Sequence, residues 1–311
     1  MNDELASGLI AAPVLPFDED GRIDWTQLGD YIAQVAAARP KAIAMNMALS
    51  EVSSLEPDEQ LQVIRTCRQA IGSRTRLLSG VSASHTGGAV TMARQLVDEG
   101  VDGLVIFAPT PAFIGTPTID MVLDYHAAIA EVSSLPVLAF QSVFSKYPAG
   151  TIKALSTIRN LVAIKDASFD VEQTWDNIQE ARGCDRRIGV LTGSDTFILE
   201  AMLMGCDGAL IGFAATATAE LVRMQKLAAE GRATEAYAIW NHLGPLARAC
   251  WRTPLRDYRV RTKYALVKQG VLKNAVVRAP LAGLAEADRA AIDRLFREHP
   301  LHDARFRPAG E

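Results

Sequence analysis

Eight short apolar segments recur along residues 8–214, and this repetition restricts the fold more than any other feature of the sequence. A longer segment with a helical pattern of apolar residues follows each of them, so that one unit takes about 25 to 35 residues. Short apolar runs that alternate with amphipathic helices are typical of α/β proteins with parallel strands. The predicted strands are residues 8–17, 42–47, 76–82, 103–109, 135–141, 161–168, 188–195 and 208–214.

Two architectures accept such units, a closed barrel and an open doubly wound sheet. A (β/α)8 barrel requires eight units, whereas an open sheet usually has fewer strands. A dinucleotide-binding sheet also carries the pattern G-x-G-x-x-G after its first strand. Here the first strand ends in PVLPFDEDG, residues 13–21, without that pattern. We therefore predict an α/β fold of the (β/α)8 TIM barrel type.

The strand pattern stops after Ala214, and residues 217–296 are almost entirely helical in pattern. No stretch rich in Gly, Ser or Pro marks a flexible linker between the two parts. We therefore predict a barrel over residues 1–225 and a C-terminal helical region over residues 226–311 that packs on the barrel.

The composition, with 49% hydrophobic and 22% charged residues, is typical of a soluble globular protein. A net charge of -4 gives no attraction to nucleic acid or to an anionic membrane, and we expect neither as a partner. Asp257 interrupts a local cluster of arginines, which we expect to be a solvated helix face or a subunit contact. The cluster consists of Arg252, Arg256, Arg259 and Arg261.

The cysteines are widely separated and form no C-x-x-C pair, so that we expect reduced thiols and no metal site: Cys67, Cys184, Cys206 and Cys250. No apolar run is long enough to span a bilayer. The first residues, MNDE, do not resemble a signal peptide. These features predict a cytoplasmic protein.

A lysine follows the apolar run of the sixth predicted strand, in LVAIKDAS, residues 161–168. Catalytic groups of a (β/α)8 barrel lie at the C-terminal ends of its strands, where Lys165 would point into the barrel mouth. An ordinary lysine is only about 0.04% neutral at pH 7, but burial raises that fraction and makes the amine a nucleophile. Position alone leaves open a second role, in which Lys165 ends the strand and pairs with Asp166 or Asp170.

The chain resembles the dihydrodipicolinate synthase and N-acetylneuraminate lyase family of class I, Schiff-base aldolases. The resemblance rests on the order of several blocks, among them APVLPFDEDGRID, LLSGVSASHT, IKDAS, VLTGSD, GCDGALIGFA and KYALVKQGVL. It implies a TIM barrel with a helical C-terminal region, usually a homotetramer. It also implies carbon–carbon or carbon–oxygen lyase chemistry through an imine between Lys165 and a 2-keto acid, with no metal or organic cofactor.

Three departures from the family pattern concern the site. In the family, the second of two threonines in the second loop holds the keto-acid carboxylate together with adjacent backbone amides. Both threonines are replaced here, by Ala48 and Leu49, although Ser50 adds a hydroxyl next to them and the loop amides could still serve. The tyrosine that transfers protons is replaced by Phe140, whose ring has no proton to transfer. A second family tyrosine falls near Pro111 and is also absent.

Three explanations of these departures remain open. Tyr147, seven residues after Phe140, could supply the missing hydroxyl, or it could pack on the rim of the barrel. A group of the substrate or a water molecule could transfer the proton instead. Alternatively, the chain has kept the lysine and lost catalysis, and binds a keto acid or sugar acid.

Backbone at the ends of the seventh and eighth strands could bind an anion, because barrels often hold one there on amides, or it could form ordinary strand-to-helix turns. The candidates are Gly193, Ile211 and Gly212, where glycine also permits close approach. With Lys165 and Tyr147 as catalytic residues, the predicted substrate-binding set is Ala48, Leu49, Ser50, Phe140, Gly193, Ile211 and Gly212.

The sequence thus predicts a lyase that acts on a small-molecule 2-keto acid, such as pyruvate or a sugar-derived keto acid. We expect a homo-oligomer, a tetramer or a dimer. The alternatives are a non-catalytic binding barrel and dihydrodipicolinate synthase itself.

Overall fold

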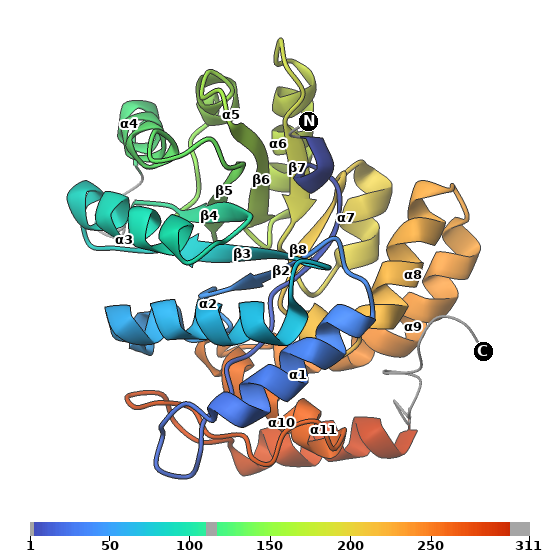
Figure 1. Ribbon diagram of the computed structural model, residues 1–311. Helices are drawn as coiled ribbons and strands as arrows, with labels where there is room; N and C mark the ends of the chain where they lie inside the picture. Colours follow the sequence, from blue (N-terminus) through green and yellow to red (C-terminus); the bar gives the residue numbers. More distant parts are fainter. Residues whose placement is uncertain (1–2, 110–116, 299–311) are drawn as a thin grey trace.

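The computed structural model describes residues 3–109 and 117–298 and contains a closed barrel of eight parallel strands in the order β1 to β8 (Figure 1). Pairing of β1 with β8, for example Leu9 opposite Ala209, closes the barrel. The predicted fold is confirmed. The strands are β1 Gly8–Ala11, β2 Ala42–Met45, β3 Arg76–Val81, β4 Gly103–Phe107, β5 Val137–Ser142, β6 Leu161–Ala167, β7 Gly189–Thr192 and β8 Gly208–Ile211.

Helices cover the outside of the barrel (Figure 1). Some of them begin at a side-chain cap, as at α1, where the Asp24 carboxylate accepts a hydrogen bond from the Gln27 amide. They are α1 Trp25–Ala37, α2 Pro57–Ile71, α3 Thr86–Asp98, α4 Ile119–Ala130, α5 Thr151–Leu155, α6 Val171–Arg182, α7 Ile198–Met204 and α8 Thr218–Ala229.

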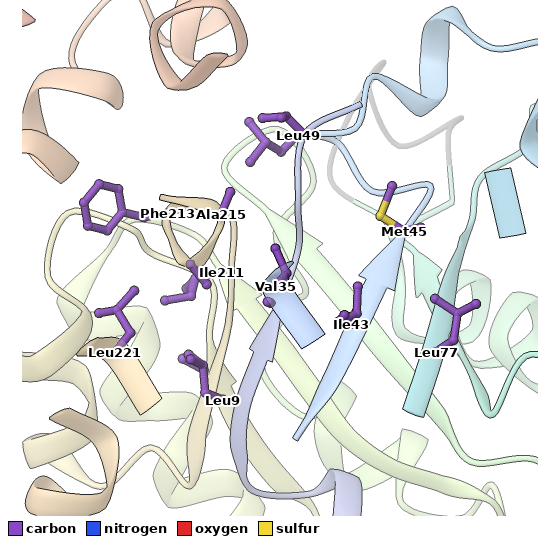
Figure 2. Packing of buried hydrophobic residues seen from close by; sticks show 14 of the residues in the cluster. Leu9, Val35, Ile43, Met45, Leu49, Leu77, Ile211, Phe213, Ala215 and Leu221 are labelled. Carbon is purple, nitrogen blue, oxygen red and sulfur yellow. The ribbon is translucent and has the colours of Figure 1, made fainter. Parts of the chain in front are cut away.

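Both faces of the strands are buried, and each face belongs to a different apolar cluster. Side chains such as Ile10, Leu78 and Leu138 fill the inside of the barrel. Their sequence neighbours point outward, and Figure 2 shows Leu9 and Ile43 on the helix-facing side together with Val35 of α1. Burial on both faces explains why the strands are continuous apolar runs and do not alternate with polar residues.

Up to residue 298, where the described chain ends, the C-terminal region contains three further α-helices, α9 Ala233–Cys250, α10 Tyr258–Lys268 and α11 Glu286–Glu298. Helix α9 packs along α8, and α10 and α11 pack against α9 (Figure 1). The predicted boundary at residues 225 and 226 falls inside α8, and residues 299–311 of the second part lie outside the described chain. The division into two parts therefore stays a prediction.

A buried ion pair ties the C-terminal region to the loop after β2. The Lys263 ammonium on α10 donates to the carboxylate of Glu51, and both side chains are fully buried. The Arg278 amide donates a second hydrogen bond to the same carboxylate. Because an unpaired charge is costly in the interior, this arrangement holds the loop at a definite place above the barrel.

None of the helices within residues 3–109 and 117–298 combines the length and the apolar character needed to cross a membrane.

Candidate active site

A cavity of about 340 Å³ lies at the C-terminal ends of the strands. Residues in or just after every strand except β3 contribute to its wall, including Ala12, Phe107 and Lys165. The C-terminal region closes one side with Trp251 and Tyr258. This is the end of a (β/α)8 barrel at which binding groups gather.

The Lys165 side chain lies in the wall of this cavity and is only 7% exposed. Its nitrogen is 4.2 Å from the centre of the Phe140 ring. A Cβ atom at position 193 would lie 2.6 Å from Lys165 Cε, so that Gly193 leaves room for the lysine. Burial lowers the pKa of Lys165 below its ordinary value, and the nearby charge of Asp195 opposes that shift.

The alternative in which Lys165 pairs with a neighbouring aspartate does not fit the contacts of those aspartates. Asp166 accepts hydrogen bonds from Gln141 at 3.0 Å and from Thr174 at 2.6 Å. Asp170 pairs with Lys146 at 2.7 Å. Within the described residues no carboxylate is close enough to form an ion pair with Lys165. The amine therefore faces the cavity without a fixed ionic partner.

A buried carboxyl group, Asp195, lines the same cavity. Its Oδ1 atom accepts a hydrogen bond of 2.6 Å from the Phe213 amide, at the start of the loop after β8. Burial raises the pKa of Asp195, while that hydrogen bond and the charge of Lys165 act in the opposite direction. The cavity thus combines one amine and one carboxyl group whose pKa values are shifted toward each other.

The loop after β2 contributes Ala48 and Leu49 to the cavity wall, and substrate binding at both positions stays a prediction. Ser50 does not reach it. Its buried hydroxyl accepts a hydrogen bond from the Met47 amide at 2.7 Å and donates one to the Met47 carbonyl at 3.1 Å. The expectation that Ser50 contacts the substrate is therefore corrected, because local backbone groups use its hydroxyl.

Three further predicted positions lie in the cavity wall, namely Phe140, Gly193 and Gly212. The Phe140 ring packs edge-on against Phe107, with 4.8 Å between ring centres. A Cβ atom at position 212 would lie 2.8 Å from Leu49 and 2.9 Å from Trp251, so that only glycine fits between them. Ile211 is not part of the wall, because its side chain points to the outer cluster, as Figure 2 shows.

The prediction for Tyr147 is also corrected. Its side chain is buried outside the cavity, and its hydroxyl lies 3.0 Å from Nε2 of His126 on α4. Gln141 holds the backbone by accepting a hydrogen bond of 2.7 Å from the Tyr147 amide. Tyr147 is therefore not exposed on the rim and does not line the cavity. The position of the second family tyrosine, near Pro111, lies outside the described residues.

Sequence reasoning missed the contribution of the C-terminal region to the site. The arginine cluster is not a solvated helix face: Arg261 is buried against Asp288, and Arg259 lines the cavity. Arg252 and Arg256 fit the expectation in part, since their side chains are 44% and 73% exposed, and Arg256 lies at the edge of the cavity. Trp251 and Tyr258 complete this wall and stack with their ring centres 5.5 Å apart.

In the described part of the chain, no three His, Cys, Asp or Glu side chains lie close enough together to hold a metal ion.

Comparison with known proteins places this arrangement in a family. The model of the "Dihydrodipicolinate synthetase family" matches residues 5–299. The chain belongs to this family. The predicted family and enzyme class, a lyase of the dihydrodipicolinate synthase family, are therefore confirmed.

Several relatives match over nearly their whole length. The 4-hydroxy-tetrahydrodipicolinate synthase of Chlorobium limicola is 29% identical over 93% of this chain and 96% of that protein. The Gluconobacter oxydans protein of the same name is also 29% identical, over 95% of this chain and 97% of that one. A pyruvate-complexed crystal structure of dihydrodipicolinate synthase from Acinetobacter baumannii has a TM-score of 0.86 at 24% identity, covering 96% of this chain and 100% of that chain. At this identity, the structural likeness supports the fold alone.

Proposed function

We propose that the protein is a Schiff-base-forming lyase that acts on a 2-keto acid, with Lys165 as the nucleophile. One observation carries the proposal: the Lys165 amine is buried in the wall of a cavity large enough for a small molecule and has no ionic partner among the described residues. Desolvation favours the neutral amine, which is the form that attacks a carbonyl.

The neutral amine would attack C2 of the keto acid. The new N–C2 bond forms as the π electrons of the carbonyl move to its oxygen, which takes up a proton while the nitrogen loses one. When that oxygen takes up a second proton, it leaves as water, and the electron pair of the nitrogen forms the C=N bond of a protonated imine. The protonated imine then accepts the electron pair that C3 keeps when its bond to C4 or its bond to hydrogen breaks. The first case is aldol cleavage, and the second begins a dehydration.

Each of these steps needs a group that accepts and returns a proton, and we assign this role to Asp195. The Phe140 ring has no exchangeable proton, and the Tyr147 hydroxyl is bound to His126 away from the cavity. Asp195 lines the cavity beside Lys165, and burial brings its pKa upward, toward the range in which a carboxyl group exchanges protons near neutral pH.

The second part of the substrate would meet an apolar wall. Phe107, Phe140 and Leu49 stand where a polyhydroxylated substrate would need hydrogen-bonding partners. We therefore infer a keto acid, or an aldehyde partner, that carries fewer hydroxyl groups than a sialic acid.

A second candidate, 4-hydroxy-tetrahydrodipicolinate synthase, is favoured by the names of the relatives, which match over nearly the whole chain. That enzyme would condense pyruvate with an aspartate-derived semialdehyde. The apolar residues Ala48, Leu49 and Phe140 argue for a different second substrate. Incubation with pyruvate and this semialdehyde, followed by mass spectrometry of the products, separates the two candidates.

Reductive trapping tests the proposal. The protein is incubated with pyruvate and a panel of 2-keto acids, treated with borohydride and digested, and the peptide that contains Lys165 is weighed. We expect an adduct on Lys165, its loss in Lys165→Ala, and its retention in Lys146→Ala, which removes an ion-paired lysine of a nearby loop. No adduct with any keto acid would favour the non-catalytic binding barrel.

We also infer a homo-oligomeric assembly, a tetramer or a dimer, as the family resemblance implies. Light scattering on the purified chain would then give two or four times the mass of 33.6 kDa, and a mass of one chain would contradict the inference.

A further inference from the structure

A keto-acid carboxylate at the proposed site needs a hydrogen-bond donor, since burial of an unpaired charge is costly. The side chains of the loop after β2 do not supply one. Ala48 and Leu49 are apolar, and the Ser50 hydroxyl is bound to the Met47 backbone. If the proposed function, on which this inference rests, is correct, a charged side chain elsewhere in the wall would add the donor that the side chains of this loop lack.

Arg259 lies directly against this loop. Its Nε atom donates a hydrogen bond of 2.7 Å to the Ala48 carbonyl, across 211 positions of sequence. The guanidinium carbon is 4.6 Å from the ring centre of Tyr258, which in turn stacks on Trp251. The carbonyl and the ring fix the plane of the guanidinium at the wall of the cavity that Lys165 also lines.

The positive charge of Arg259 has no carboxylate partner in the described part of the chain. Its one hydrogen bond there uses Nε, so that the two terminal nitrogens keep their donors for a ligand. The nearby carboxylate of Glu51 is already paired with Lys263. Arg256, at the cavity edge, differs because it is largely exposed and pairs with Asp257 at 3.3 Å.

We propose that Arg259 binds the carboxylate of the 2-keto acid and takes the place of the hydroxyl groups that the loop after β2 lacks. A guanidinium presents two parallel N–H donors that match the two oxygens of a carboxylate. Arg259 is a binding residue in this proposal, and the chemistry remains with Lys165 and Asp195. The ligand class is a small 2-oxo monocarboxylate.

The test compares pyruvate with its neutral methyl ester in the trapping assay. For each compound, the concentration that gives half-maximal adduct on Lys165 is measured in the full-length protein. A charge-assisted hydrogen bond of this kind corresponds to about ten- to a hundredfold in affinity. We expect the unmodified protein to prefer pyruvate over the ester by that factor. Arg259→Gln should lose this preference, because it should bind pyruvate more weakly than the unmodified protein does and the ester equally well.

Two further variants sharpen the result. Arg256→Gln removes a charge from the same segment, and we expect it to change the preference by less than about threefold because solvent screens an exposed charge. Arg259→Lys keeps the charge without the paired donors, and an intermediate preference is expected. Thermal unfolding of each variant verifies its fold. If Arg259→Gln does not fold, the preference of Arg259→Lys is the test of the proposal.

The inference is overturned if the unmodified protein forms the adduct and both Arg259 variants keep its full preference for pyruvate. An equal loss of preference in Arg256→Gln would also overturn it, because the effect would then come from overall charge. Absence of any adduct in the unmodified protein would instead reject the proposed function.

Discussion

At the scale of single residues, Lys165 and Asp195 form a pair in which each charge alters the pKa of the other. Burial lowers the pKa of Lys165, and the Asp195 carboxylate raises it again. The rate of adduct formation with pyruvate should therefore rise with pH and level off below the ordinary lysine pKa of about 10.4. Stopped-flow rates measured between about pH 5 and about pH 10 locate this inflection.

Asp195→Asn tests the second member of the pair. The Asn side chain keeps an oxygen that can accept the hydrogen bond from the Phe213 amide, so that the loop after β8 should not change. Loss of the negative charge should move the inflection of the pH–rate profile to lower pH, because the ammonium loses its stabilising neighbour. Turnover should fall by about a hundredfold or more. An unchanged profile together with unchanged turnover would exclude a proton-transfer role for Asp195.

The ring centre of Phe140 lies 4.2 Å from the Lys165 nitrogen, and the family has a tyrosine at this position. Phe140→Tyr should therefore speed the exchange of the C3 protons of pyruvate with deuterated solvent by about tenfold or more, because the added hydroxyl can move protons. Proton NMR follows the exchange. Phe107→Tyr adds the same group to the neighbouring ring and should have a smaller effect, and equal acceleration by both variants would speak against a specific role of position 140.

At the scale of structural elements, the Glu51–Lys263 pair couples the loop after β2 to α10. Glu51→Gln leaves the Lys263 ammonium buried without its partner, which should lower the free energy of unfolding by about 3–5 kcal/mol. Urea unfolding followed by circular dichroism measures the change. Glu99→Gln, which breaks a pair with the half-exposed Arg65, should have a much smaller effect, and similar losses in both variants would contradict the structural role of Glu51.

The same coupling explains why the C-terminal helices belong to the site. Helix α10 carries Lys263 to Glu51 and, from its first turn, Arg259 to Ala48. The element that stabilises the loop is thus also the one that places a cation beside it. A change that weakens the contacts of α10 should therefore reduce the affinity for pyruvate more than it reduces the stability of the barrel strands.

At the scale of the whole molecule, one apolar cluster runs from the outer faces of the strands through α8 into α9, where Trp240 and Leu243 belong to it. A chain that ends at Ala229 would expose this surface and lack Trp251 and Arg259. We expect it to lose the cooperative urea transition of the full chain and to form no Lys165 adduct. A cooperative transition with the same midpoint as that of the full chain would instead support two independent units.

The sequence by itself determined the barrel and the position of Lys165. Both follow from local patterns, namely apolar runs that must be buried on two faces and the rule that strand ends form the mouth of a barrel. The family resemblance added the expected chemistry and identified Ala48, Leu49 and Phe140 as departures.

Only the tertiary structure decided which side chains reach the cavity. The loop position of Tyr147 predicts an accessible hydroxyl, but this hydroxyl contacts His126, and the Ser50 hydroxyl is bound to the backbone of its own loop. Arg259 reaches Ala48 across 211 positions, a distance over which no local periodicity carries information. Hydrogen-bond partners and burial are set by contacts between distant segments, and these exist only once the chain has folded.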